Sequence, residues 1–100
     1  MGGPALSVSL TAAVTDESLD AIDTVFEQHC SRVERTRKGR VWSLWIGAQP
    51  YYARVDVDET SQNRVWIDAG CNSREDYENL RILAKAICDT VGGMSSEPTK

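Results

Sequence analysis

Residues 41–69 read VWSLWIGAQPYYARVDVDETSQNRVWIDA, and this stretch decides the fold. Apolar and polar side chains alternate along three parts of it, residues 40–47, 51–58 and 63–69. A two-residue period is typical of a β-strand with one buried face. Short segments that contain glycine, proline or small polar residues separate the three parts. We therefore expect three consecutive strands that pair as an antiparallel meander.

The alternation also assigns each side chain of the meander to one face of the sheet. The side chains expected to point into the core are Trp42, Leu44, Ile46, Tyr51, Ala53, Val55, Val57, Val65, Ile67 and Ala69. Those expected on the opposite, outer face are Val41, Ser43, Trp45, Tyr52, Arg54, Asp56, Asp58, Arg64, Trp66 and Asp68. Two tryptophans and a tyrosine are thus expected outside the core.

Short turns also predict a register, because residues that face each other across a ladder must share a face. Closing the first hairpin over GAQP, residues 47–50, sets Trp45 opposite Tyr52. Closing the second hairpin sets opposite charges against each other twice, which stabilises such a pairing. These two pairs are Arg54 with Asp68 and Asp58 with Arg64.

A strand and a helix are expected before the meander. Residues 5–14, ALSVSLTAAV, alternate in the same way and predict the strand. Thr15 or Asp16 can then cap a helix that runs to about residue 33. Its apolar side chains recur at spacings of three and four. They are Leu19, Ile22, Phe26, Cys30 and Val33.

A second helix is expected after the meander, over residues 74–91. Ser73 and Asp76 have the spacing of a capping box at its start. Gly92 and Gly93 follow its last apolar residue, and glycine readily adopts the left-handed conformation that ends helices.

The resulting order is β-α-β-β-β-α. Each helix has one apolar stripe and each strand one apolar face, which favours an α+β two-layer sandwich. We expect a four-stranded, mostly antiparallel sheet with both helices on one face. Residues 1–100 form a single domain, in which 1–4 and 94–100 are expected to be flexible.

Composition narrows the class of protein. An apolar content of 41% with a net charge of only −4 is typical of a folded chain. No stretch approaches the roughly 20 apolar residues of a membrane span, and the start lacks a secretory signal, so we expect a cytoplasmic protein without membrane contact. Residues 1–31 carry five acids and no Lys or Arg, whereas residues 32–40 carry five bases and one acid. This acidic balance disfavours nucleic-acid binding, which needs a cationic face.

The outer face of the sheet is the first candidate site. Trp, Tyr and Arg dominate the hot spots of protein interfaces. We therefore expect Trp45, Tyr52 and Trp66 to anchor a protein partner and Arg54 and Arg64 to orient it. Alternatively, these aromatic residues serve only strand stability, or one end of the chain lies across them.

The first helix carries the second candidate. Its carboxylates at positions 16, 20, 23 and 27 follow each other at helical spacing and form an acidic ridge opposite the apolar stripe. The ridge consists of Asp16, Asp20, Asp23 and Glu27. It could steer a cationic partner. An ordinary solvated face, with acids favoured near the helix start, is the alternative.

Nothing in the sequence matches a catalytic, metal-binding or cofactor-binding motif, so we expect neither an enzyme nor a cofactor. His29 is the only histidine, and its neighbour Cys30 projects about 100° away around the helix. Cys71, close to the start of the second helix, is the one thiol that could be activated there. A small enzyme that uses Cys71 therefore stays open as a third hypothesis.

The last helix, LRILAKAICDTVGGM (80–94), follows the strand segments YYARVDV and RVWIDAG and ends in paired glycines. This half of the chain resembles the small immunity proteins encoded beside bacterial polymorphic toxins. The resemblance implies a cytoplasmic, non-enzymatic inhibitor that binds a cognate toxin domain tightly. The leading hypothesis is therefore an immunity protein that acts by occlusion. The runner-up is a structural or regulatory domain that forms a homodimer or larger homo-oligomer through the outer face.

Overall fold

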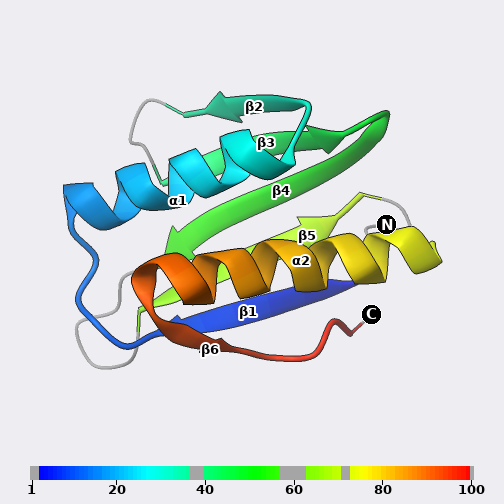
Figure 1. Ribbon diagram of the computed structural model, residues 1–100. Helices are drawn as coiled ribbons and strands as arrows, with labels where there is room; N and C mark the ends of the chain where they lie inside the picture. Colours follow the sequence, from blue (N-terminus) through cyan, green and yellow to red (C-terminus); the bar gives the residue numbers. More distant parts are fainter. Residues whose placement is uncertain (1–2, 37–39, 57–62, 71–72, 100) are drawn as a thin grey trace.

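A computed structural model describes residues 3–36, 40–56, 63–70 and 73–99 (Figure 1). Its elements are β1 (Ala5–Leu10), α1 (Asp16–His29), β2 (Arg32–Arg35), β3 (Val41–Ile46), β4 (Gln49–Asp56), β5 (Arg64–Ala69), α2 (Arg74–Val91) and β6 (Gly93–Ser95). The strands form one antiparallel sheet in the order β2-β3-β4-β5-β1-β6, and both helices lie on the same side of it (Figure 1). The expected α+β class with two helices is confirmed. The expectation of four strands in the order β-α-β-β-β-α is wrong, because the sheet has six.

Strand β2 replaces the last turn expected of the first helix. Helix α1 ends at His29, and Cys30 adopts an extended conformation. Val33 then lies opposite Leu44 and adds its side chain to the inner side of the sheet. An apolar residue three positions after Cys30 fits the helical spacing equally well, so the pattern did not separate the two conformations.

Strand β6 is formed by part of the segment expected to be frayed. Gly92 turns the chain with a φ of 80°, and Gly93–Ser95 then pairs with β1. Gly93 approaches β1 so closely that a Cβ there would lie 2.6 Å from the backbone oxygen of Ser9. A glycine is therefore needed at this position for the pairing. Thr99 continues along the same edge and bridges to Ala5.

Both helices begin with a capping box. Thr15 caps α1, and its hydroxyl accepts from the backbone N–H of Ser18. Ser73 caps α2 in the same way, with Asp76 as the reciprocal partner. The predicted bounds of α2 are confirmed. Neither helix of the described chain is long and apolar enough to cross a membrane.

The core lies between the helices and the inner face of the sheet. The side chains predicted to point inward on the meander are buried, except that Ile46 is half-buried and Val57 lies outside the described residues. From α1, Phe26 packs edge-on against Trp42 with ring centroids 5.3 Å apart. Leu6, Val8 and Leu10 of β1 are buried as well, so the strand before the meander presents the face that its alternation predicts.

The predicted register is wrong by two residues in both hairpins. Trp45 lies opposite Pro50 rather than Tyr52, and Arg54 lies opposite Trp66 rather than Asp68. The first hairpin closes with Gly47 and Ala48 alone between the strands, and Gly47 takes a φ of 62°.

Packing on the inner face explains the shift of the second hairpin. The observed register sets the large Tyr51 opposite the small Ala69, and Ala53 opposite Ile67. The predicted register would have set the two alanines opposite each other and left a gap in the core. The expected pair of Asp58 with Arg64 includes a residue outside the described range, and Arg64 lies opposite Asp56 instead. A shift of two residues leaves every side chain on its predicted face.

Candidate functional site

The outer face of the sheet points away from both helices (Figure 1). The burial pattern places the expected aromatic side chains on this face. Tyr52 is 53% exposed and Val41 is 42% exposed. Trp45 and Trp66 are half-buried. Their position on this face follows directly from the burial of their neighbours Leu44, Val65 and Ile67 on the other face.

The three aromatic residues form a diagonal band across the middle of the sheet. Trp45 lies opposite Pro50, two residues before Tyr52, and Tyr52 lies opposite Asp68, two residues after Trp66. Diagonal neighbours of this kind are roughly 7–8 Å apart in a sheet and lie within reach of aromatic side chains. We call Trp45, Tyr52 and Trp66 the aromatic band.

Arginines lie over both indoles of the band. The guanidinium of Arg32 is 4.7 Å from the ring centre of Trp45, and that of Arg54 is 5.9 Å from the ring centre of Trp66. Cation–π contacts at exposed sites contribute about 0.5–1 kcal/mol each. These contacts explain why the two indoles are only half-exposed on an open face. The sequence did not single out Arg32, because its strand was expected to be helical.

Ion pairs neutralise part of the charge on this face. Arg32 pairs with Glu34 on β2, and Arg54 pairs with Asp56 on β4 at 3.6 Å. The side chains of Arg64 and Asp68 on β5 are exposed and form no ion pair or hydrogen bond in the described part of the chain. The predicted pair of Arg54 with Asp68 is therefore absent, since the shifted register places Tyr52 opposite Asp68.

Described residues of the outer face line two hollows. One of about 200 Å³ is lined mainly by Val41, Tyr52, Arg54, Trp66 and Asp68. A shallower one of about 720 Å³ lies between β1 and β6, where Arg64 and Met94 border a row of serines. The smaller hollow borders two members of the aromatic band and has the size to accept a side chain of a partner.

The described ends of the chain continue the backbone pairing of the sheet. Gly3 and Pro4 extend the pairing of β1 with Ala69 of β5. At the other end, Ser96 and Thr99 hydrogen-bond to the backbone of β1. Neither of these segments crosses the aromatic band, so the alternative in which an end of the chain covers it finds no support among the described residues.

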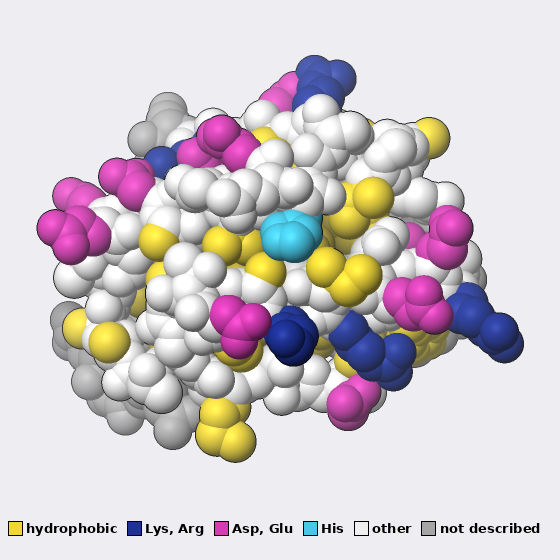
Figure 2. Space-filling view, viewed as in Figure 1, with side chains coloured by type: hydrophobic (Ala, Val, Ile, Leu, Met, Phe, Trp, Pro, Cys, Tyr) yellow, Lys and Arg dark blue, Asp and Glu magenta, His cyan; other side chains and the backbone are white. Residues whose placement is uncertain are grey.

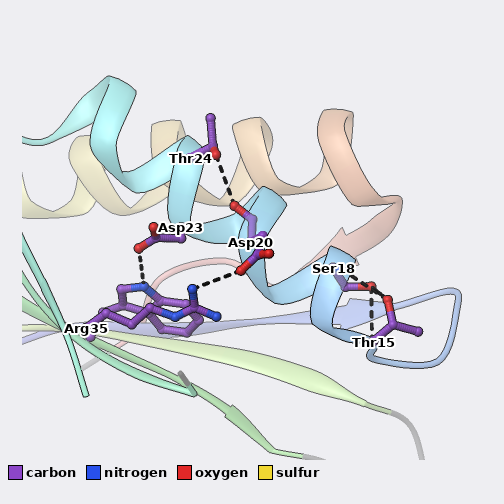
Figure 3. Close-up of polar contacts among 7 residues, drawn as sticks. Thr15, Ser18, Asp20, Asp23, Thr24 and Arg35 are labelled. Carbon is purple, nitrogen blue, oxygen red and sulfur yellow. Dashed lines mark hydrogen bonds and ion pairs between the residues drawn. The ribbon is translucent and has the colours of Figure 1, made fainter. Parts of the chain in front are cut away.

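The acidic ridge lies on the helical side of the molecule, where Figure 2 shows acidic side chains gathered over α1. Asp20 accepts a hydrogen bond from Arg35 at 3.0 Å, and Asp23 accepts one from the indole N–H of Trp42 at 2.8 Å (Figure 3). Both carboxylates therefore tie α1 to the sheet. Asp16 lies exposed in the first turn of the helix.

Glu27, the last residue of the ridge, lies one turn after Asp23. A hydrogen bond with the Asp23 carboxyl and the negative charge of that group raise the pKa of Glu27 above its usual value. The ridge and the aromatic band are on opposite sides of the sheet. They form two separate surfaces, and one flat partner surface cannot cover both.

A buried polar cluster that the sequence did not reveal lies between β4 and α2. The Tyr51 hydroxyl donates to Asp76 at 2.6 Å and accepts from the side-chain amide of Asn79 at 2.9 Å. The other carboxylate oxygen of Asp76 accepts from the backbone N–H and hydroxyl of Ser73. Burial and the adjacent Asp76 raise the pKa of Tyr51 to about 12. The cluster is fully satisfied and fixes the start of α2 on the sheet.

The described cysteines do not form a reactive centre. Burial raises the pKa of Cys30 to about 11 and also raises that of Cys88. Both thiols are therefore protonated near neutral pH. Cys71, the nucleophile of the third hypothesis, lies outside the described residues. Within the described ranges, no three His, Cys, Asp or Glu side chains are grouped so that they could hold a metal ion.

Comparison with known protein families, with curated proteins and with solved structures found no match to this chain.

Proposed function

We propose that this chain is a non-enzymatic protein-binding domain that acts as an inhibitor of the toxin-immunity type. In this proposal the outer face of the sheet docks on a cognate toxin domain and occludes its active surface. The observation that carries it is the aromatic band, which lies in the middle of an open sheet face with arginines around it. Such a centre, surrounded by polar groups, has the composition of an interface hot spot.

The charge on this face favours a protein over a nucleic acid. Its described strands carry three cations, Arg32, Arg54 and Arg64, against three anions, Glu34, Asp56 and Asp68. Nucleic-acid binding requires an excess of cations that can neutralise phosphates. A balanced face suits a protein surface on which both signs of charge occur.

Inhibition by occlusion needs rigidity rather than chemistry. The aromatic band lies on three central strands of the sheet, and the core holds their opposite side fixed. Sites on such elements keep their geometry better than sites on loops. The resemblance of the second half of the chain to immunity proteins supplies the class of partner. The ridge formed by Asp16, Asp20, Asp23 and Glu27 would steer a cationic partner.

The test begins with capture of binding proteins from the source cell by the immobilised chain. A captured protein is then purified, and its affinity is measured by isothermal titration calorimetry. Trp45→Ala and Tyr52→Ala are each expected to weaken binding at least about tenfold, as truncation of hot-spot residues does. Glu78→Ala, an exposed change on α2, serves as the matched control and should leave affinity unchanged.

A second readout tests the toxin-immunity class. The captured protein should arrest growth when it is expressed alone, and coexpression with this chain should restore growth. Coexpression with Tyr52→Ala should restore it less. Equal affinity of the wild type and both aromatic variants would refute docking through the outer face. A captured protein that has no effect on growth would refute the toxin class.

A further inference from the structure

On the outer face, strand β5 carries opposite charges at equal distances from a central tryptophan. Arg64, Trp66 and Asp68 are its three outward residues, so a cation and an anion lie two residues to either side of a central indole. Each charge is about 7 Å along the strand from the tryptophan. Both charged side chains are exposed, and neither has an ion-pair partner in the described chain.

The other charged side chains that the structure describes on this face are already paired. Arg32 is bound to Glu34, and Arg54 to Asp56, which is also the residue directly opposite Arg64. The carboxylate that could have neutralised Arg64 thus contacts another arginine. Among the described residues of this face, Arg64 and Asp68 thus stay without an ion-pair partner, and both lie on the same strand.

We propose that, when its other partner is absent, a second copy of this chain covers the outer face through a two-fold axis that passes over Trp66. The axis lies between the two sheets and runs perpendicular to β5. Rotation about it reverses the strand, so Arg64 of each copy meets Asp68 of the other. In an isologous interface of this kind each contact away from the axis occurs twice. Arg64 and Asp68 of the two copies therefore form two ion pairs.

The neighbouring strands are compatible with this arrangement. Val41, Arg54 and Ser7 lie in the same cross-strand row as Trp66 and would each meet their own copy. Val41 is 42% exposed and gains an apolar contact. Arg54 meets a like charge, but each guanidinium already has Asp56 beside it at 3.6 Å.

Tyr52 and Asp56 lie two residues to either side of Arg54 on β4. The same rotation therefore sets the phenol of Tyr52 against the carboxylate of Asp56 of the second copy. Packed sheets keep their strands within about 30° of each other, so these correspondences hold near the axis. The described charges of the face balance, whereas the acidic ridge on α1 lies on the opposite, helical side of the sheet. Two copies of a chain with a net charge of −4 can therefore approach through this side with little repulsion.

This inference goes beyond the proposed function, because it concerns the state of the free protein. The two states would compete for one surface, since a toxin domain and a second copy need the same aromatic band. Dimerisation is measured on the purified chain alone, so its failure leaves the capture experiment unaffected.

The experiment is sedimentation velocity of the purified chain over a range of concentrations. The wild type should show a reversible monomer–dimer equilibrium. Arg64→Asp and Asp68→Arg should each raise the dissociation constant at least about tenfold, because each creates two like-charge contacts. The double variant Arg64→Asp/Asp68→Arg should restore it to within about threefold of the wild type.

A mixture of the two single variants gives the sharpest readout. In a mixed dimer one contact has the exchanged pair and the other has the original pair. The mixture should therefore dimerise more tightly than either variant alone. Lys85→Asp and Glu78→Arg carry the same charge changes on the exposed side of α2 and should leave the equilibrium unchanged. Circular dichroism checks that every variant is folded.

Three results would overturn the proposal. The first is a wild-type chain that stays monomeric at all concentrations. The second is a dimer that is insensitive to both single variants. The third is a pair of weakened single variants whose mixture fails to dimerise, which would exclude the two-fold contact between residues 64 and 68.

Discussion

The contact between Asp23 and Trp42 gives a sharp test of how α1 is held on the sheet. The indole of Trp42 is fully buried, with Phe26 at its edge and the Arg35 guanidinium 5.5 Å from its ring centre. Its N–H donates to Asp23 at 2.8 Å. The Asp23→Ala variant leaves this buried donor without an acceptor, which costs about 1–3 kcal/mol. Because Asp23 is only half-buried and water can reach part of the site, we expect about 2 kcal/mol of lost stability.

The loss is measured by urea unfolding followed by tryptophan fluorescence, and by thermal unfolding. A loss of about 2 kcal/mol should lower the Tm by roughly 8–16 °C in a domain of this size. Asp23→Asn keeps an oxygen acceptor and should retain most of the stability. Gln28→Ala, on the exposed side of the same helix, is the control and should change little.

The neighbouring Glu27 complicates the measurement, because removal of Asp23 also removes a carboxylate that repels it. The comparison is therefore repeated in a Glu27→Gln background, where this repulsion is absent. If Asp23→Ala stays within about 0.5 kcal/mol of its parent in both backgrounds, the hydrogen bond does not hold the helix, since surface substitutions commonly fall in that range. If Asp23→Asn is as unstable as Asp23→Ala, the lost stability comes from the missing negative charge and not from the missing hydrogen-bond acceptor.

Three further predictions concern groups whose environment the fold determines. Tyr51→Phe removes a donor to the buried Asp76 carboxylate and should lower the free energy of unfolding by about 1–3 kcal/mol in urea titrations, and an unchanged midpoint would contradict this role. The pKa of Glu27 is raised in the folded chain, so the ionised carboxylate destabilises the folded state above that pKa. Glu27→Gln should therefore increase the Tm at pH 7. This gain should vanish below about pH 4.5, where the glutamate is protonated in both the folded and the unfolded chain. The pKa of Cys30 is about 11 in the folded chain against the usual 9.0, so at pH 8 the folded chain has about a hundredfold less Cys30 thiolate than the unfolded chain. In a variant whose other cysteines are replaced by serine, maleimide should therefore label the folded chain about a hundredfold more slowly than the unfolded chain. The same raised pKa means that its contribution to stability, complete below pH 9, should be lost as the pH rises through about 11, and labelling at the unfolded rate would show that the thiol is not shielded.

Side-chain alternation predicted the faces of the sheet well, because parity is a local property of a strand. Trp66 alternates with Val65 and Ile67, whatever strand lies beside it, and the burial of these two neighbours sets its position. The start of α2 was equally local, since a capping box needs only Ser73 and Asp76. By contrast, β2 and β6 exist only through pairing with another strand, β2 with the following β3 and β6 with β1 near the other end of the chain. Nothing within Arg32–Arg35 shows that β3 has a free edge to pair with.

The register could not be predicted from charge, and this limit decides what the candidate site can do. The register predicted from the sequence set Arg54 opposite Asp68, so that their charges would cancel. Exposed ion pairs of this kind contribute only about 0.2–1 kcal/mol. The observed register sets the large Tyr51 opposite the small Ala69 and so fills the core. This packing contributes more to stability than the exposed ion pair, because an unfilled gap in the core costs more free energy than the pair supplies. The two-residue shift kept the aromatic band on its predicted face and at the same time separated the charges expected to cancel. Arg64 and Asp68 are consequently available to another molecule because inner-face packing, rather than outer-face charge, sets the register.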